Sequence, residues 1–76
     1  MNYNELSLLG KKITALTEQI AKKEQEWMQI LSNCPNENSH EFKRAKDLFE
    51  EQLKLAKCKQ EMEMQIREFF NIVTRF

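Results

Sequence analysis

Glycine and proline are almost absent from this sequence of 76 residues, which has one of each, Gly10 and Pro35. A loop that cradles phosphate groups needs several glycines close together, so one isolated glycine excludes a glycine-rich phosphate loop. One proline leaves a single strong interruption in the chain. These scarcities favour long, uninterrupted segments on either side of Pro35.

Long hydrophobic runs and a secretory leader are also missing from the sequence. No apolar stretch approaches the roughly 18 residues of a membrane span. No positively charged segment followed by an apolar core opens the chain. We therefore expect a cytoplasmic protein with no membrane partner.

The sequence has only two cysteines, Cys34 and Cys58. The residues between them would separate them by on the order of 25 Å or more along a helix, at 1.5 Å per residue. A disulfide within the chain would need the two Cα atoms within about 7 Å of each other. We expect reduced thiols in a reducing compartment, with a disulfide between subunits as the alternative.

An excess of one charge is missing too. The chain has 12 basic and 12 acidic residues, with four of each sign before Pro35 and eight of each after it. The most basic stretch, residues 43–59, is interrupted throughout by acidic residues, so few counterions would be released from a phosphate backbone. Nucleic acid is therefore disfavoured as the main partner, and a small RNA-binding helical dimer stays open only as a third hypothesis.

No group of side chains in the sequence carries recognisable chemistry. His40 is the only histidine, and no second histidine or cysteine pair accompanies it at metal-ligand spacing. The acidic pairs of the second half lie one or two positions apart, and such neighbours do not face each other on a helix. We expect a non-enzymatic protein with no catalytic residue, no metal and no cofactor.

What the sequence does have is a heptad repeat. Apolar residues of the first half recur at alternating steps of three and four, interrupted only by Lys23. Such a stripe can face only another helix. The stripe consists of Leu6, Leu9, Ile13, Leu16, Ile20, Trp27, Ile30 and Cys34.

The one break lies at Pro35, where the ring removes a backbone donor and disfavours helical dihedrals at Cys34. We expect a helix at about residues 4–33, a turn at about 34–39 and a second helix at about 40–75. Asn2 with Glu5 has the spacing of a capping box for the first helix, which begins at Asn2 or Asn4. The second helix starts on Asn38 with Glu41, or on Ser39.

The second half also repeats every seven residues and gives the other side of the seam. Its strong seam positions are Leu48, Leu55, Met62, Ile66 and Phe69, and its middle is polar at Gln52 and Lys59. Folding back at about residue 36 gives an all-α, antiparallel two-helix hairpin with Trp27 near Ala45 and Phe49. Lys23 then lies near Glu50 or Gln52, and we expect its ammonium to extend to water.

The second helix has more apolar surface than one facing helix can hide. An exposed patch of that kind usually marks a binding surface, and a chain this short is marginally stable alone. We therefore expect a protein interface, or pairing of two hairpins into a four-helix bundle. The predicted interface residues are Phe42, Phe49, Leu53, Phe70, Ile72, Val73 and Phe76.

This layout resembles the short helical-hairpin proteins of bacterial type III secretion, above all the E-component family, which are cytosolic co-chaperones of the needle subunit. The similarity lies in two amphipathic helices around one polar loop, here Asn36 to Glu41 followed by Phe42. It implies that the hairpin binds a larger helical chaperone and keeps a secreted helical subunit unpolymerised.

Needle subunits are similar as well, with a proline-containing turn comparable to residues 34–38 and an apolar C-terminal end comparable to Ile72, Val73 and Phe76. The chain lacks the second proline of that turn, and its dense charges and regular heptads favour a chaperone over a needle. The alternative to a co-chaperone is a structural subunit that self-assembles.

Overall fold

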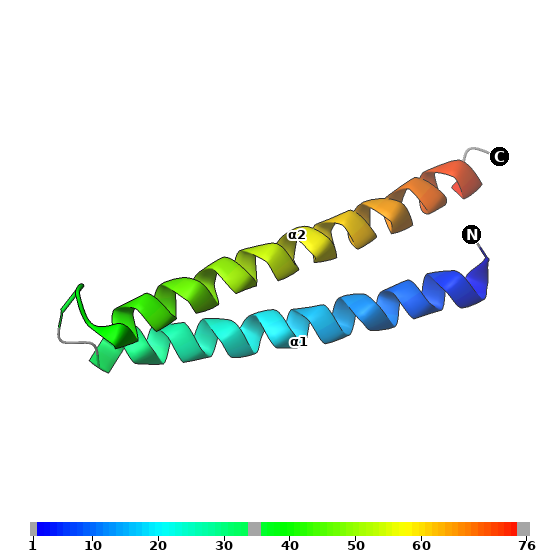
Figure 1. Cartoon of the computed structure of the whole chain (residues 1–76). Helices are drawn as coiled ribbons and strands as arrows, with labels where there is room; N and C mark the ends of the chain where they lie inside the picture. Colours follow the sequence, from blue (N-terminus) through cyan, green and yellow to red (C-terminus); the bar gives the residue numbers. More distant parts are fainter. Residues whose placement is uncertain (1, 34–35, 75–76) are drawn as a thin grey trace.

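The computed structural model describes residues 2–33 and 36–74 as two long α-helices, α1 (Tyr3–Asn33) and α2 (His40–Thr74) (Figure 1). The helices run antiparallel and pack against each other along the chain's length, with no strand in these residues. The predicted all-α hairpin is therefore confirmed. Cys34, Pro35 and Phe76 lie outside the described residues.

The first turn of α1 is held by a reciprocal cap. The backbone N–H of Glu5 donates to Oδ1 of Asn2 at 2.9 Å, and the N–H of Asn2 donates back to Oε2 of Glu5 at 3.4 Å. This is the capping box predicted from the spacing, and it satisfies two donors that have no partner within the helix. Asn2, rather than Asn4, is the residue that caps α1.

The start of α2 is capped by Ser39, the second of the two positions that the sequence left open. The N–H of Phe42 donates to Oγ of Ser39 at 3.2 Å, and that hydroxyl donates to the carbonyl oxygen of Asn36 at 3.0 Å. The N–H of Asn38 turns instead toward Oδ1 of Asn36, at 2.9 Å. Asn36 and Ser39 together therefore fold the end of the connection onto the first turn of α2.

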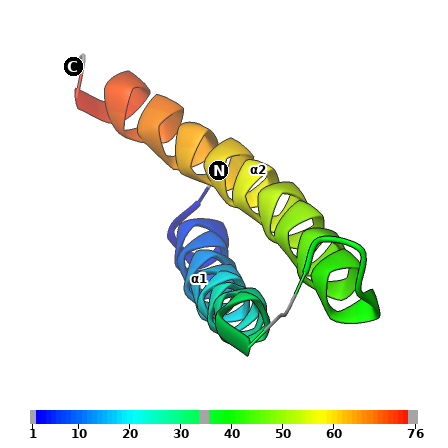
Figure 2. The same ribbon diagram turned by 90° about the vertical axis from the view of Figure 1, so that its left-hand side faces the viewer.

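The hairpin is long, thin and more open at one end. Its extents are 58 × 17 × 13 Å, and its radius of gyration of 17.2 Å exceeds the roughly 11 Å of a compact chain of this length. The two helices lie closest beside the connection and diverge toward the termini (Figures 1 and 2). Of the described residues only Ala45 and Leu48, both near the connection, are buried.

The seam itself is half-buried along the rest of its length. Because the helices are a single pair, each seam side chain is covered from one direction and stays open at its flanks. The half-buried seam residues are Leu6, Leu9, Ile13, Leu16, Ile20, Trp27 and Ile30 on α1, and Leu55, Met62, Ile66 and Phe69 on α2. Lys23, Gln52 and Lys59 are half-buried with them.

Polar contacts cross the seam in its connection half. Lys23 does not simply extend to water, because its Nζ donates to Oε2 of Glu51 at 2.6 Å. Gln52, which we expected near Lys23, instead accepts from Nε1 of Trp27 at 2.6 Å. The sequence-based pairing matched residues only by their level along the two helices. The large indole of Trp27 reaches one turn farther along α2 than that level.

Candidate protein-binding surface

The hairpin has two sides, one on each flank of the seam, and they differ in chemistry. One side carries Glu26, Arg44 and Glu51 next to the seam, and we call it the charged side. The other carries Leu31, Phe42 and Phe49 next to the seam, and we call it the apolar side. On α2, Arg44 and Glu51 lie seven residues apart, as do Phe42 and Phe49, so each pair stays on one side of the helix.

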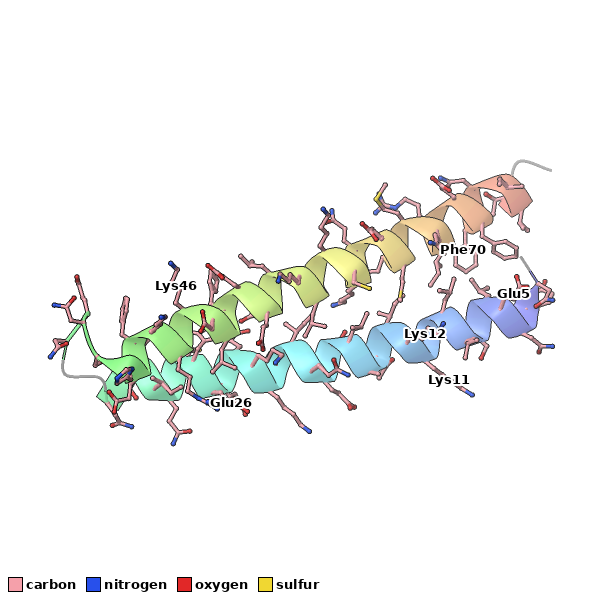
Figure 3. All side chains as sticks on the ribbon, in the orientation of Figure 1. Glu5, Lys11, Lys12, Glu26, Lys46 and Phe70 are labelled. Atoms are coloured by element: carbon pink, nitrogen blue, oxygen red, sulfur yellow. The ribbon has the colours of Figure 1, made fainter. Side chains whose placement is uncertain are left out.

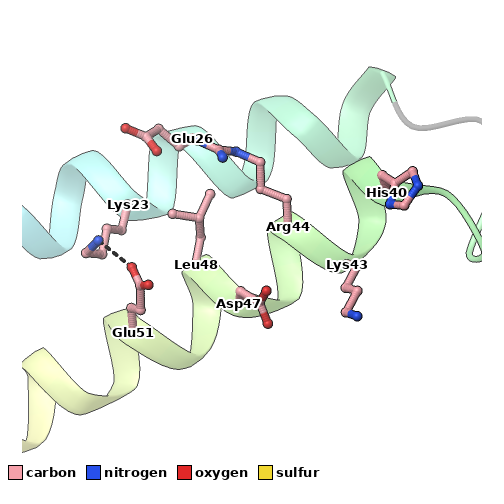
Figure 4. Close-up of a pocket in the computed structure, with 8 residues that line it drawn as sticks. All are labelled: Lys23, Glu26, His40, Lys43, Arg44, Asp47, Leu48 and Glu51. Atoms are coloured by element: carbon pink, nitrogen blue, oxygen red, sulfur yellow. Dashed lines mark hydrogen bonds and ion pairs between the residues drawn. The ribbon is translucent and has the colours of Figure 1, made fainter.

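The charged side has a shallow groove near the connection (Figure 4). Leu48 points from α2 toward α1 at its floor, and Arg44 extends from α2 toward Glu26 on α1 (Figure 4). Lys23 holds the pKa of Glu51 below its ordinary value of 4.5, first through the hydrogen bond from its ammonium and then through its charge. Charges of both signs alternate here, which favours a solvated surface.

His40 lies at the edge of this groove, beside Lys43 (Figure 4). Among residues 2–33 and 36–74, no three side chains of His, Cys, Asp or Glu gather closely enough to hold a metal ion. The groove therefore offers a mixed-charge surface rather than a set of metal ligands.

The apolar side has a groove of about 370 Å³ between the helices near the connection. Trp27 and Leu31 form its wall on α1, and Phe42, Ala45, Lys46 and Phe49 form its wall on α2. The rings of Trp27 and Phe49 pack edge to face, with centroids 5.6 Å apart and an interplanar angle of 75°. The indole N–H is already satisfied by Gln52, so Trp27 presents only carbon to the groove.

Two further side chains extend this groove into a continuous patch. Met28 precedes Leu31 by three residues on α1, and Leu53 follows Phe49 by four on α2, so each lies on the same side as its neighbour. Both are 53 % exposed. We define the apolar patch as Met28, Leu31, Phe42, Phe49 and Leu53.

The open end has a second groove on the same side, between Ile13 on α1 and Ile66 and Phe70 on α2. Phe70 packs edge to face against Phe69, with centroids 6.0 Å apart, yet remains about half exposed. Figure 3 places Phe70 at the end of the hairpin where α1 begins at Glu5. Glu63 and Arg67 border this groove, so it is less apolar than the patch near the connection.

From Gly10 to Ala21, α1 presents small uncharged residues on the apolar side, and Glu24 follows them before the patch. The hydroxyl of Thr14 donates to the carbonyl of Gly10 at 3.1 Å, and that of Thr17 donates to the carbonyl of Ile13 at 2.8 Å. Their polar groups are thus turned back onto the helix. An atom added at the Cβ position of Gly10 would meet nothing within 4 Å, so a neighbouring chain can approach α1 closely here.

The predicted interface residues are only partly brought together. Phe42, Phe49, Leu53 and Phe70 lie on the apolar side. Ile72 is exposed, but its seven-residue spacing puts it on the line of Arg44 and Glu51, the charged side. Val73 is exposed at the open end of the seam, and Phe76 lies outside the described residues.

Two residues of the patch, Met28 and Leu31, were not predicted from the sequence. Each directly follows a seam residue, Trp27 or Ile30, and so lies beside the α1 stripe rather than on it. The signal that could have found them is the one used for α2, namely apolar residues of α1 left over after the seam is assigned.

Neither helix, over the residues that the structure describes, has a segment long and apolar enough to cross a membrane. Comparisons with protein-family models, curated proteins and solved structures gave no match to this chain. What the molecule does is therefore inferred from its own surface.

Proposed function

We propose that this chain is a non-enzymatic, protein-binding hairpin that acts as a cytosolic co-chaperone by covering an apolar helix of its partner. The observation that carries this proposal is the apolar patch, five large apolar side chains that all lie on one side of the hairpin. Exposed patches of this kind on small proteins mark interaction sites.

The shape of the apolar side favours a helical partner. The patch is backed by an edge-to-face aromatic pair, and the groove between α1 and α2 runs parallel to both helices. An amphipathic helix laid into such a groove inserts apolar residues at helical spacing and leaves its polar face to water. Away from the patch, the open space at Gly10 on the same side of α1 lets that helix come close to the hairpin.

The same chemistry explains how such binding would act as chaperoning. A helical subunit that polymerises exposes an apolar face before it assembles, and that face is the surface an amphipathic groove can occupy. The hairpin has no net charge, and its charged side carries residues of both signs. That side would keep the complex solvated without attracting polyanions. The client fitting the resemblance is the needle subunit of type III secretion, bound with or through a larger helical chaperone.

The test is co-purification of the full chain with the needle subunit and with the large helical-repeat chaperone of the secretion system in its host. We expect a stoichiometric complex with at least one of them, measured by light scattering. Leu53→Glu, in the apolar patch, should weaken binding at least tenfold.

Leu8→Glu is the matched control, because Leu8 is also 53 % exposed but does not belong to the apolar patch. It should leave binding unchanged. If the folded chain binds neither protein, or if the two variants weaken binding equally, this function is wrong.

A further inference from the structure

We propose that, without a partner, a second copy of this chain covers the apolar side, with the two connections at the same end of a four-helix bundle. This inference concerns the chain alone and does not depend on the co-chaperone role.

The hairpin exposes more surface than a compact monomer of the same mass, as a subunit of a dimer would. The chain exposes 6362 Å², whereas a compact monomer of 9.2 kDa exposes about 4,900 Å². The excess is about 1,400 Å² per chain, and two chains hiding it would bury about 2,800 Å². That total lies in the range of obligate homodimers, about 2,000 to 5,000 Å².

The apolar side can cover itself when two copies are related by a two-fold axis along the hairpin. This axis places α1 of one copy antiparallel to α2 of the other. Residues at the same level along the hairpin then face each other, as they do within one chain. α1 is centred on residue 18 and α2 on residue 57, so Phe49 falls level with residue 26 of the second copy and Leu53 with residue 22. On the apolar side of that α1, the nearest side chains are Met28 and Glu24 for Phe49, and Ala21 for Leu53. Phe49 then has Met28 and Leu53 has Ala21 as its apolar neighbour, with Glu24 between these two levels.

The opposite, head-to-tail arrangement buries less apolar area. It would place the patch of each copy over the open half of the other, where Gln60, Glu63 and Arg67 occupy the apolar side of α2. Desolvating those polar groups against Phe49 and Leu53 costs free energy. The same-end arrangement leaves them near the small residues of the second copy's α1, where water and the diverging ends accommodate them.

Charge does not oppose this pairing. The apolar side carries Glu24, Lys46, Glu63 and Arg67, two residues of each sign. The strongly charged side, with Glu26, Arg44 and Glu51, faces outward in the dimer and stays hydrated.

The first measurement is analytical ultracentrifugation of the purified full chain over a hundredfold range of concentration. We expect a dimer that dissociates on dilution, with a thermal midpoint that rises with concentration. Leu53→Glu should shift the dissociation constant by at least tenfold, and Leu8→Glu should not. A monomer at all concentrations, filaments, or equal effects of the two variants would overturn the proposal.

The second measurement tests the arrangement and remains informative if Leu53→Glu unfolds the chain. In a background with Cys34→Ser and Cys58→Ser, the single variants Ala21→Cys and Leu53→Cys are mixed and oxidised. The same-end dimer should give the mixed 21–53 cross-link in excess over either homodimer. A cross-link between Leu53→Cys and Gln60→Cys that forms in preference would establish the head-to-tail arrangement and overturn this one.

Discussion

Lys23 and Glu51 lie 28 residues apart in the chain and are joined across the hairpin by a hydrogen bond of 2.6 Å between Nζ and Oε2. One turn along α1, Trp27 makes the second polar bond across the seam, to the residue after Glu51. Neighbours on a helix point in different directions, so one bond lies on the charged side and the other within the seam. Sliding α2 by one turn would break both, and together they fix the register of the hairpin.

The Lys23–Glu51 bond predicts a specific pH dependence. The folded-state pKa of Glu51 is lowered, so its contribution to stability is present above the ordinary value of 4.5 and is lost as the pH falls through the folded-state value. Glu51→Gln should therefore lower the thermal midpoint at pH 7, and the gap from wild type should narrow as the pH falls below 4.5 and close once it passes below the folded-state pKa of Glu51. Circular dichroism at several pH values measures it.

The effect should be small and should shrink with added salt, because Glu51 is exposed and Lys23 is only half-buried. Glu50→Gln is the control, since it removes a neighbouring carboxylate without removing the acceptor of Lys23. A gap that persists unchanged at pH 3, or that Glu50→Gln reproduces, would show that the Lys23 bond is not its source.

Because burial is unequal along the seam, we expect Leu48 to contribute more to the free energy of unfolding than Leu9. Leu48→Ala removes a buried side chain beside the connection and should lower the free energy of unfolding by about 2 to 5 kcal/mol. Leu9→Ala makes the same chemical change in the half-buried seam near the open end and should cost clearly less. Urea denaturation of both variants at one concentration checks this; equal losses would contradict the divergence of the helices.

The cap of α2 gives a prediction about a single hydroxyl. Ser39→Ala removes the acceptor of the Phe42 N–H and should destabilise the hairpin by about 1 kcal/mol. Ser32→Ala is the matched control, because the Ser32 hydroxyl only bonds back to the carbonyl of Gln29 within α1. Thermal denaturation should show a loss for Ser39→Ala alone, and Ser39→Asp should retain most of the stability.

Gly10 should be replaceable with a gain in stability. It lies inside α1, where alanine is favoured over glycine by about 1 kcal/mol, and a new Cβ would meet nothing within 4 Å. Gly10→Ala should therefore raise the thermal midpoint measured by circular dichroism. A lower midpoint would mean that α1 is approached here by something that the isolated hairpin does not contain.

Much of this fold is local in origin and could be predicted from the sequence. The Asn2–Glu5 cap depends on a spacing of three residues, and the packing of Trp27 against Phe49 follows from heptad position and a turn near Pro35. Such features need only the geometry of one helix and the direction of the chain.

The features that could not be predicted depend on how two helices meet in space. The bond from Trp27 to Gln52 requires the length of an indole across the seam, which a level-by-level pairing does not include. The choice of Ser39 over Asn38 depends on a hydroxyl shared with the carbonyl of Asn36. The placement of Ile72 apart from the patch depends on which flank of the seam each residue faces.

The two buried residues next to the connection also bear on how the hairpin forms. Ala45 and Leu48 meet α1 across a short connection, so bringing them together closes a small loop at low entropic cost. Pairs nearer the termini close longer loops for less burial. The hairpin should therefore nucleate at the connection and zip toward the termini, with its last turns the first to exchange their amide hydrogens with solvent.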